Sequence, residues 1–378
     1  MNDLYILWLL SLSPKQFLPR NYKLIKLCKD GKDLYEKCDG GLDKGLFSEK
    51  DRKELSSRPL DKARFLLDKY KKDGINIISY YDNSYPSFLK EISTPPPALF
   101  VKGKLPDTCE NPSITIVGTR NCTEEGRKNA ARFSYALSEM GFSVVSGMAR
   151  GIDTYAHKGC LFSGKNPTVA VLAGGVDNIY PPENKELYNA ITESGAVISE
   201  ALPGTPPIKA FFPIRNRILS AITFGTLIIE TAIEGGSLIT AKYALEQNKL
   251  IFAVPGGLNA AKSKGTNALI KEGAILCNGI SCVIEEYYPI YGDKIKIAWE
   301  QEIKKRNTEV KKRNANKIET LDENEKKIYH MLKEEPLSAD KISEKTNLSI
   351  NTTIALLQNM EINEIIKPIK GGLYIVRL

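Results

Sequence analysis

Six short apolar runs lie between residues 114 and 254 and dominate the hydrophobic pattern of the chain. Segments of helix length separate most of them. Uninterrupted apolar strands that alternate with helices are typical of a parallel sheet covered on both faces. The pattern therefore predicts a doubly wound α/β domain over residues 76–290. The six runs are Ile114–Val117, Phe142–Val145, Thr168–Leu172, Ala196–Ile198, Thr226–Ile229 and Leu250–Val254.

The regions on either side of this domain have other patterns. Residues 1–75 alternate short apolar clusters with Lys and Asp at spacings of three and four, which predicts a small helical domain. Residues 291–319 carry the basic runs Lys304–Arg306 and Lys311–Arg313 among few apolar side chains. We interpret this segment as a basic linker, with a basic arm on nucleic acid as the alternative.

Residues 320–378 predict a separate compact unit. Three helical segments are followed by two β runs, and this order is typical of a winged helix. Ser338 and Ser349 are the expected N-caps of the second and third helices. The third helix, expected from Ile350 to about Ile362, carries no Lys or Arg, although readers of the major groove need both phosphate and base contacts. We therefore favour a protein contact or a packing role for this unit over the reading of DNA.

Length and composition fit an ordinary globular protein of two to three domains. The chain has 378 residues, of which 42% are hydrophobic and 26% are charged, and this excludes a disordered protein. The apolar stretch Leu4–Leu12 is too short to span a bilayer and follows no basic segment, so a signal peptide is not expected. Seven cysteines without a CxxC pair indicate reduced thiols of a cytoplasmic protein. We expect no membrane partner, no metal and no cofactor.

Glycines and polar residues follow the predicted strands. Ligands of open α/β sheets bind beyond the carboxyl ends of the strands, where glycines let a phosphate approach backbone N–H groups. Arg120 and Arg150 can add charge-assisted contacts to phosphate. The alternative is that the glycines only form turns and the arginines pair with Asp153, Glu200 or Glu230. The segments at the strand ends are Gly118–Asn121, Ser146–Asp153, Gly174–Gly175, Ser199–Glu200, Glu230–Thr231 and Pro255–Gly257.

A second cluster, Lys209–Arg217, combines one lysine, two arginines and two aromatic residues. Cations that hold a backbone beside an aromatic face that stacks a base suit a single strand of nucleic acid. The net charge of +8 permits such a polyanionic partner without requiring one. The alternative buries Phe211 or Phe212, and at least one of the arginines must be structural.

Two further motifs lack the context that their chemistry needs. Gly159–Asn166 resembles a Walker A loop, but Asn166 replaces the Mg²⁺-binding hydroxyl and the segment follows a helix. Asp153 and His157 are four residues apart on one helix face, without the nucleophile elbow of a catalytic triad. We expect a structural hydrogen bond between them and no catalytic residues.

Several motifs at the strand ends together span about residues 78–278. They are Ile116–Arg120, Ser146–Asp153, Ile179–Asn184, Phe212–Ile218, Gly235–Ala241, Phe252–Gly256 and Gly265–Ile270. In this order they resemble the DNA-processing protein A family, also called DprA or Smf. The tail resembles the winged helix that many members carry, whereas the first 75 residues match the family only loosely.

The resemblance implies an extended Rossmann-like domain that binds single-stranded DNA and forms a homodimer. It implies a non-catalytic role in natural transformation, in which the protein protects incoming single strands and helps to load the RecA recombinase. On the family pattern Arg120 and Lys209 hold the DNA backbone, and Phe212 shapes a base pocket. Pro182 stands where some members have a lysine, and we expect this departure to weaken one phosphate contact. The expected DNA-binding residues are Gly118, Thr119, Arg120, Gly147, Arg150, Gly174, Lys209, Phe212, Arg215, Asn216 and Arg217.

Two rival hypotheses belong to other classes of protein. Related Rossmann proteins hydrolyse nucleotides with an Arg and a Glu near a glycine-rich loop. Here Arg120 or Arg150, Glu230 and Gly235–Ser237 could imitate that site, although Pro255–Gly257 lacks the loop sequence of such hydrolases. The other rival is a regulator that reads double-stranded DNA through its winged helix.

Overall fold

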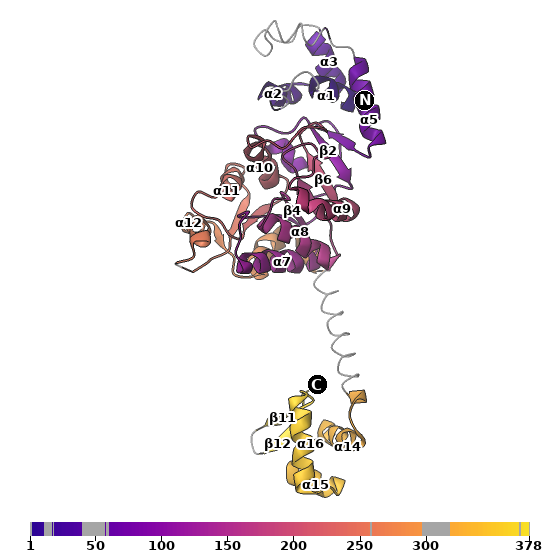
Figure 1. Ribbon diagram of the computed structural model, residues 1–378, viewed down its shortest axis with the longest axis vertical. Helices are drawn as coiled ribbons and strands as arrows, with labels where there is room; N and C mark the ends of the chain where they lie inside the picture. The colour runs from indigo at the N-terminus through magenta and orange to yellow at the C-terminus, as the bar shows by residue number, and fades with distance from the viewer. Residues whose placement is uncertain are drawn as a thin grey trace. The chain divides into compact units, whose positions relative to one another are not determined.

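The computed structural model describes residues 2–10, 17, 19–39, 57, 60–257, 259–296, 318–369 and 372–377. The chain divides into two compact units, Met1–Trp299 and Glu300–Leu378, and each is described by itself. Figure 1 gives the helices and strands of both units. None of the helices in these ranges is both long enough and apolar enough to cross a membrane.

A nine-stranded sheet runs through the described part of the first unit, in the order β1-β2-β6-β5-β4-β3-β7-β8-β9. The strands from β6 to β9 in this order are parallel, whereas β2 pairs with both β1 and β6 in the antiparallel sense. The six predicted strands are β3–β8, so the parallel α/β prediction is confirmed. The bounds are β1 Asn76–Ser79, β2 Ala98–Gly103, β3 Ser113–Val117, β4 Ser143–Ser146, β5 Thr168–Val171, β6 Ala196–Ser199, β7 Gly225–Ile228, β8 Leu250–Ala253 and β9 Ile275–Leu276.

Helices cover both faces of this sheet because alternate strand residues point to opposite faces. In β3, Ile114 and Ile116 pack with α7 and α8, whereas Val117 packs with α10 and α11. The sheet is therefore doubly wound, as the apolar runs predicted. The helices are α6 Ser87–Glu91, α7 Glu124–Glu139, α8 Ile152–Ser163, α9 Lys185–Ser194, α10 Phe211–Ala221, α11 Ser237–Glu246 and α12 Lys264–Lys271, with the 3-10 turns η1 Pro182–Asn184 and η2 Ala261–Ser263.

The N-terminal helices share their core with the outer strands of the sheet. Leu7 and Leu24 belong to the same buried cluster as Phe100 of β2 and Val176. Residues 1–75 are helical where the structure describes them, but they are not packed as a separate body. The helices are α1 Asn2–Leu10, α2 Pro19–Leu27, α3 Gly31–Asp39 and α5 Leu60–Lys72.

The first compact unit extends beyond the predicted boundary at residue 291. Residues 280–296 are helical, and Tyr291 and Ile295 are buried in the cluster of α7 and α8. The predicted boundary at residue 291 is therefore wrong, because these two apolar side chains complete the core. The basic runs Lys304–Arg306 and Lys311–Arg313 lie outside the described residues.

The second unit is a winged helix, as predicted. Ser338 and Ser349 accept hydrogen bonds from the first turns of α15 and α16, which confirms both expected N-caps. Asp322 and Glu325 form a capping box at the start of α14. The elements are α14 Glu323–Glu334, β10 Leu337–Ser338, α15 Ala339–Thr346, α16 Ile350–Ile362, β11 Ile366–Ile369 and β12 Leu373–Val376, and the strand order is β10-β12-β11.

Candidate nucleic-acid interface

A crevice of about 570 Å³ opens at the carboxyl ends of the central strands. The chain passes from β3 through β4 and β5 to β6 on one side of the sheet, and then returns through β7 to the other side. The crevice lies at this switch in strand order, where ligands of open α/β sheets bind. We call it the strand-end crevice. Its lining comes from the loops after β3, β4 and β5, from the loop before α10, from α10 itself and from the start of α11.

Seven of the eleven expected DNA-binding residues line the strand-end crevice. They come from two separate stretches of sequence that the fold brings together, and they are Gly118, Thr119, Arg120, Lys209, Phe212, Arg215 and Asn216. The other four, all of them described, are not part of its lining, and they are Gly147, Arg150, Gly174 and Arg217. Asp153, Tyr180, Ser237 and Thr240 line it as well. Tyr180 was missed because a single aromatic residue in a loop gives no signal of its own.

Arg120 is exposed and lies against an aromatic face. Its guanidinium carbon is 4.7 Å from the centre of the Phe212 ring, and Tyr180 packs edge-on to the same ring at 5.7 Å. Among the described residues no ion pair involves Arg120. A cation that has no carboxylate partner keeps its capacity for a phosphate. Lys209 is also exposed at the crevice, on the loop that leads into α10.

Arg215 is only 6% exposed and forms part of the crevice wall. Its Nη1 donates to the carbonyl oxygen of Gly147 at 3.0 Å and to that of Val171. Burial lowers the pKa of Arg215 to about 10, and Asp153 opposes that shift. The guanidinium therefore remains charged at neutral pH and balances the neighbouring carboxylate of Asp153 in the crevice wall.

Asp153 lies next to Arg215 and is almost fully buried. Its Oδ2 accepts from the backbone N–H of Gly147 at 3.1 Å and of Ala149 at 3.4 Å. Burial raises the pKa of Asp153 to about 6, and Arg215 opposes the rise. A Cβ on Gly147 would be 2.7 Å from both Asp153 Oδ2 and Arg215 Nη1. Gly147 therefore serves this site by leaving room for a carboxylate and a guanidinium.

The predicted hydrogen bond between Asp153 and His157 is wrong. His157 is fully buried, and its Nδ1 is 2.7 Å from Oγ1 of Thr168. Burial lowers the pKa of His157 to about 3, so the ring is neutral at physiological pH. The two side chains are on the same helix, but each finds its partner in a different neighbouring strand or loop.

Arg150 and Glu183 form an ion pair in which both side chains are about half exposed. The partner of Arg150 is therefore none of the carboxylates expected from the sequence, which were Asp153, Glu200 and Glu230. Pairs at this exposure contribute little free energy because water and salt screen them. Arg150 therefore stays within reach of solvent outside the crevice.

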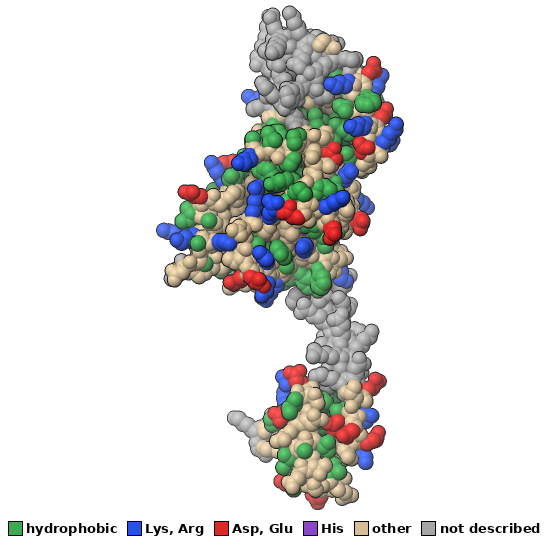
Figure 2. Space-filling model, in the orientation of Figure 1, with side chains coloured by type: hydrophobic (Ala, Val, Ile, Leu, Met, Phe, Trp, Pro, Cys, Tyr) green, Lys and Arg blue, Asp and Glu red, His purple; other side chains and the backbone are tan. Residues whose placement is uncertain are grey.

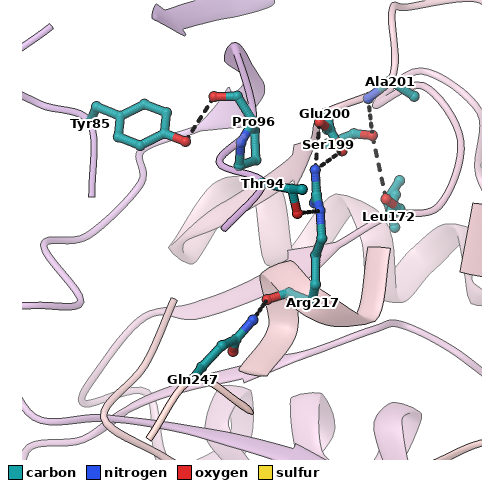
Figure 3. Close-up of polar contacts among 9 residues, drawn as sticks. All are labelled: Tyr85, Thr94, Pro96, Leu172, Ser199, Glu200, Ala201, Arg217 and Gln247. Atoms are coloured by element: carbon teal, nitrogen blue, oxygen red, sulfur yellow. Dashed lines mark hydrogen bonds and ion pairs between the residues drawn. The ribbon is translucent and has the colours of Figure 1, made fainter. Parts of the chain in front are cut away.

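Arg217 is 5% exposed and belongs to a buried network (Figure 3). Its Nη2 donates to Glu200 Oε1 at 2.7 Å and to Oε2 at 2.8 Å, and its Nε donates to Thr94 at 3.1 Å. Its guanidinium carbon is 5.1 Å from the centre of the Tyr22 ring on α2. We call these four residues the Arg217 network. The expectation that Arg217 contacts DNA does not fit this burial, and the structural alternative holds for this arginine.

Gly174 is buried below the loop that carries Lys209. A Cβ on Gly174 would be 2.9 Å from the carbonyl oxygen of Thr205, so the absence of a side chain lets this loop lie against the end of β5. Its own carbonyl oxygen accepts from Ser199 Oγ at 2.7 Å. Gly174 thus positions the loop and does not itself face the crevice.

The carboxylate of the rival hydrolase site is engaged elsewhere. Glu230 accepts from the backbone N–H of Thr123 at 2.9 Å and from the hydroxyl of the same residue. Thr123 is the N-cap of α7, so Glu230 stabilises the start of that helix. Glu230 is buried and is not among the residues that line the crevice. No group of three or more His, Cys, Asp or Glu side chains in the described ranges could hold a metal ion.

Comparisons with known proteins agree on one family. The family model for DNA recombination-mediator protein A matches residues 76–288, and the model for the DprA winged helix domain matches residues 312–372. Protein Smf of Synechocystis sp. is 32% identical over 329 residues, which is 82% of each chain. DNA processing protein DprA of Bacillus subtilis is 39% identical over 209 residues, 55% of this chain and 70% of that protein.

Two solved structures are similar to this chain. DprA from Streptococcus pneumoniae matches with a TM-score of 0.59 and 31% identity, over 75% of this chain and 97% of that one. DNA processing protein A from Helicobacter pylori matches with a TM-score of 0.52 and 27% identity, over 57% of this chain and 97% of that one. The Helicobacter structure is described as giving insight into a single-stranded DNA binding mode of that protein.

Proposed function

The chain belongs to the DNA recombination-mediator protein A family, whose members are also named DprA or Smf, and we propose that it binds single-stranded DNA in the strand-end crevice. The observation that carries the proposal is Arg120, an exposed cation without a carboxylate partner among the described residues, over the ring of Phe212. A cation beside an aromatic face complements the two parts of a nucleotide, its phosphate and its base. The single-stranded DNA named for the Helicobacter relative supports the same ligand class.

Different residues of the crevice contact the phosphates and the bases of the single-stranded DNA. Arg120 and Lys209 hold phosphates as exposed cations, while Phe212 and Tyr180 offer aromatic faces to bases. The N-terminus of α11 begins at Ser237 in the crevice wall and adds backbone N–H donors with a partial positive charge. Arg215 shapes the wall through its hydrogen bonds to Gly147 and Val171, and Gly118 and Thr119 line the turn after β3.

The wider role that we infer is the protection of single strands in natural transformation and the loading of RecA onto them. The protein performs it as a homodimer in the cytoplasm. Membership in a family of DNA-processing proteins supports this role. We assign no catalytic step, because Glu230, the carboxylate that a nucleotide hydrolase would need, accepts hydrogen bonds from Thr123 at the start of α7 instead.

The test is the salt dependence of binding to a labelled single strand and to a duplex of the same sequence. Arg120→Glu is expected to weaken single-strand binding by about tenfold or more, because a charged hydrogen bond contributes about 1.5–3 kcal/mol. It also lowers the slope of log affinity against log salt by about 0.7 for each lost phosphate contact. Arg64→Glu serves as the control, because it makes the same change of charge on α5 at a residue that does not line the crevice.

Unchanged affinity and slope in Arg120→Glu, or equal loss in Arg64→Glu, would contradict the proposed site. Equal affinity of the wild type for the single strand and the duplex would contradict the ligand. The homodimer and the loading of RecA need separate measurements. Sedimentation gives the mass of the particle in solution, and RecA-dependent pairing of protein-coated single strands reports loading.

A further inference from the structure

A groove between α7 and α8 lies outside the strand-end crevice. We call it the α7/α8 groove, and its volume is about 420 Å³. Figure 1 shows the two helices side by side on one face of the sheet, and Figure 2 shows hydrophobic, basic and acidic side chains in the region of these helices. The groove is lined by Ala131, Arg132, Tyr135, Lys158, Gly159 and Phe162.

The most unusual side chain of this groove is Phe162, which is 85% exposed. A single exposed apolar residue is ordinary, but here a second aromatic ring lies beside it, with the centre of Tyr135 at 5.8 Å. Gly159 explains the shape of the groove. A Cβ at Gly159 would collide with the backbone of Ala131, so the two helices touch at small residues and the longer side chains form the walls.

Cations alternate with aromatic rings along the two helices. Tyr155, Lys158 and Phe162 are spaced by three and four on one face of α8. Arg127 on α7 lies 5.8 Å from the centre of the Tyr155 ring, and Lys158 lies 5.5 Å from it. Among the described residues no ion pair involves Arg127, Arg132 or Lys158.

The acidic side chains of these helices leave the positive charge largely in place. Glu124 pairs with Lys128, and Glu139 is buried against Ser163. Asp153 faces the strand-end crevice, and Glu125 is the other exposed carboxylate of α7. A polyanion therefore complements the groove better than an acidic or neutral apolar surface does.

The two helices that form the groove begin at the strand-end crevice. Thr123 caps α7 three residues after Arg120, and the first turn of α8 contains Asp153 of the crevice lining. Arg127 and Tyr155 are therefore near the rim, and α8 extends from there over 12 residues, about 18 Å. At about 3.4 Å for each stacked nucleotide, this length accommodates up to about five nucleotides.

We propose that the α7/α8 groove binds the continuation of the single strand that occupies the strand-end crevice. Arg127, Arg132 and Lys158 hold its phosphates, and Tyr135 and Phe162 stack its bases. The inference rests on the proposed function, since it extends the same ligand along a second surface. Aromatic faces bind bases with little regard to sequence, which fits a protein that must accept any incoming strand.

The experiment compares two labelled thymidine oligonucleotides, one of about 6 nucleotides that fills the crevice alone and one of about 20 that reaches the groove. The groove variants are Phe162→Ala and the double variant Arg132→Glu/Lys158→Glu, whose side chains are exposed. Each is expected to weaken binding of the long strand by about tenfold and to leave binding of the short strand unchanged. The double variant also lowers the salt slope by about 1.4 with the long strand only.

A matched control removes an exposed aromatic ring and a cation from α5. Phe65→Ala/Lys69→Glu, with both side chains exposed, is expected to bind both strands like the wild type. Arg120→Glu is expected to lose both strands, which separates the crevice from the groove.

Three outcomes would overturn the inference. If the wild type binds the short and long strands equally, or if the groove variants retain wild-type affinity for the long strand, the groove takes no DNA while the crevice proposal stands. If the wild type binds neither strand, the proposed function fails as well. If Phe162→Ala lowers the mass of the particle by sedimentation, the groove is a contact between two copies of this chain.

Discussion

The two sides of α10 use similar residues for opposite purposes. On the crevice side, the ring of Phe212 contacts the guanidinium of Arg120. No carboxylate among the described residues forms an ion pair with that guanidinium. On the other side, Phe211 packs edge-on to Phe17 at 4.7 Å, and Arg217 is enclosed by its network. Seven consecutive residues thus supply both a ligand-binding surface and an attachment of the N-terminal helices. Burial and the supply of partners, and not residue type, therefore decide what an arginine does here.

The energetics of the two sides differ accordingly. A buried ion pair loses its hydration, so its net contribution is small, but either charge left alone in the interior is very costly. An exposed arginine without a partner can be removed with little effect on folding, because its charge is solvated in both states. Changes on the buried side should therefore alter stability first, and changes on the crevice side should alter binding first.

The largest expected effect comes from Glu200→Leu, which leaves Arg217 buried without its carboxylate. We expect the free energy of unfolding to fall by about 3–5 kcal/mol, measured by urea denaturation. The double variant Glu200→Leu/Arg217→Met removes both charges and should recover most of that loss. Arg120→Met should change stability by no more than about 0.5 kcal/mol. An equal loss of stability in the single and double variants would show that packing, and not the pairing of charges, stabilises the Arg217 network.

The pH dependence of stability gives a second test, on the groups below the crevice. The pKa of His157 is lowered to about 3, so the unfolded state binds more protons and stability falls as the pH drops below about 6.5. The pKa of Asp153 is raised to about 6, so the folded state binds the extra proton between about pH 6 and pH 4 and stability rises as the pH falls across that window. The two groups therefore oppose each other between pH 6 and pH 4.

Asp153→Asn should expose the effect of His157. Its free energy of unfolding is expected to fall more steeply than that of the wild type from pH 6 to pH 4, with a difference of up to about 3 kcal/mol. Urea denaturation at several pH values measures this difference, and His157→Gln provides the opposite slope. Parallel curves for the wild type and Asp153→Asn would mean that Asp153 titrates normally.

The sequence predicted the fold well because apolar strands and helix caps are local signals. The runs that became β3–β7 are buried on both faces, and that of β8 is buried in its second half. Ser338 and Ser349 cap the helices that they precede. The edge of the sheet was harder. β2 pairs in the antiparallel sense with β6, which is far away in sequence, and β1 joins the sheet only through β2. β9 is only two residues long.

The site was predicted in part for the same reason. The strand-end rule placed Arg120 correctly at the crevice, since the end of β3 is defined by the chain itself. No local pattern could tell Arg215 and Arg217 from Arg120, because their burial depends on Val171, Glu200 and Tyr22 from other elements. The same limit explains His157, whose partner Thr168 belongs to β5 and not to its own helix.

The smallest expected effects come from a matched pair of neighbours, Phe211→Leu and Phe212→Leu. Phe212→Leu removes an aromatic face beside Arg120 and should weaken single-strand binding by about tenfold, since stacking contributes about 1–3 kcal/mol for each base. Phe211→Leu removes the edge-on contact with Phe17 and should cost about 1 kcal/mol of stability without changing affinity. Binding titrations give the affinity of each variant for the single strand, and urea denaturation gives its free energy of unfolding. If affinity and stability fall together in both, α10 is a single coupled element and its two sides do not act separately.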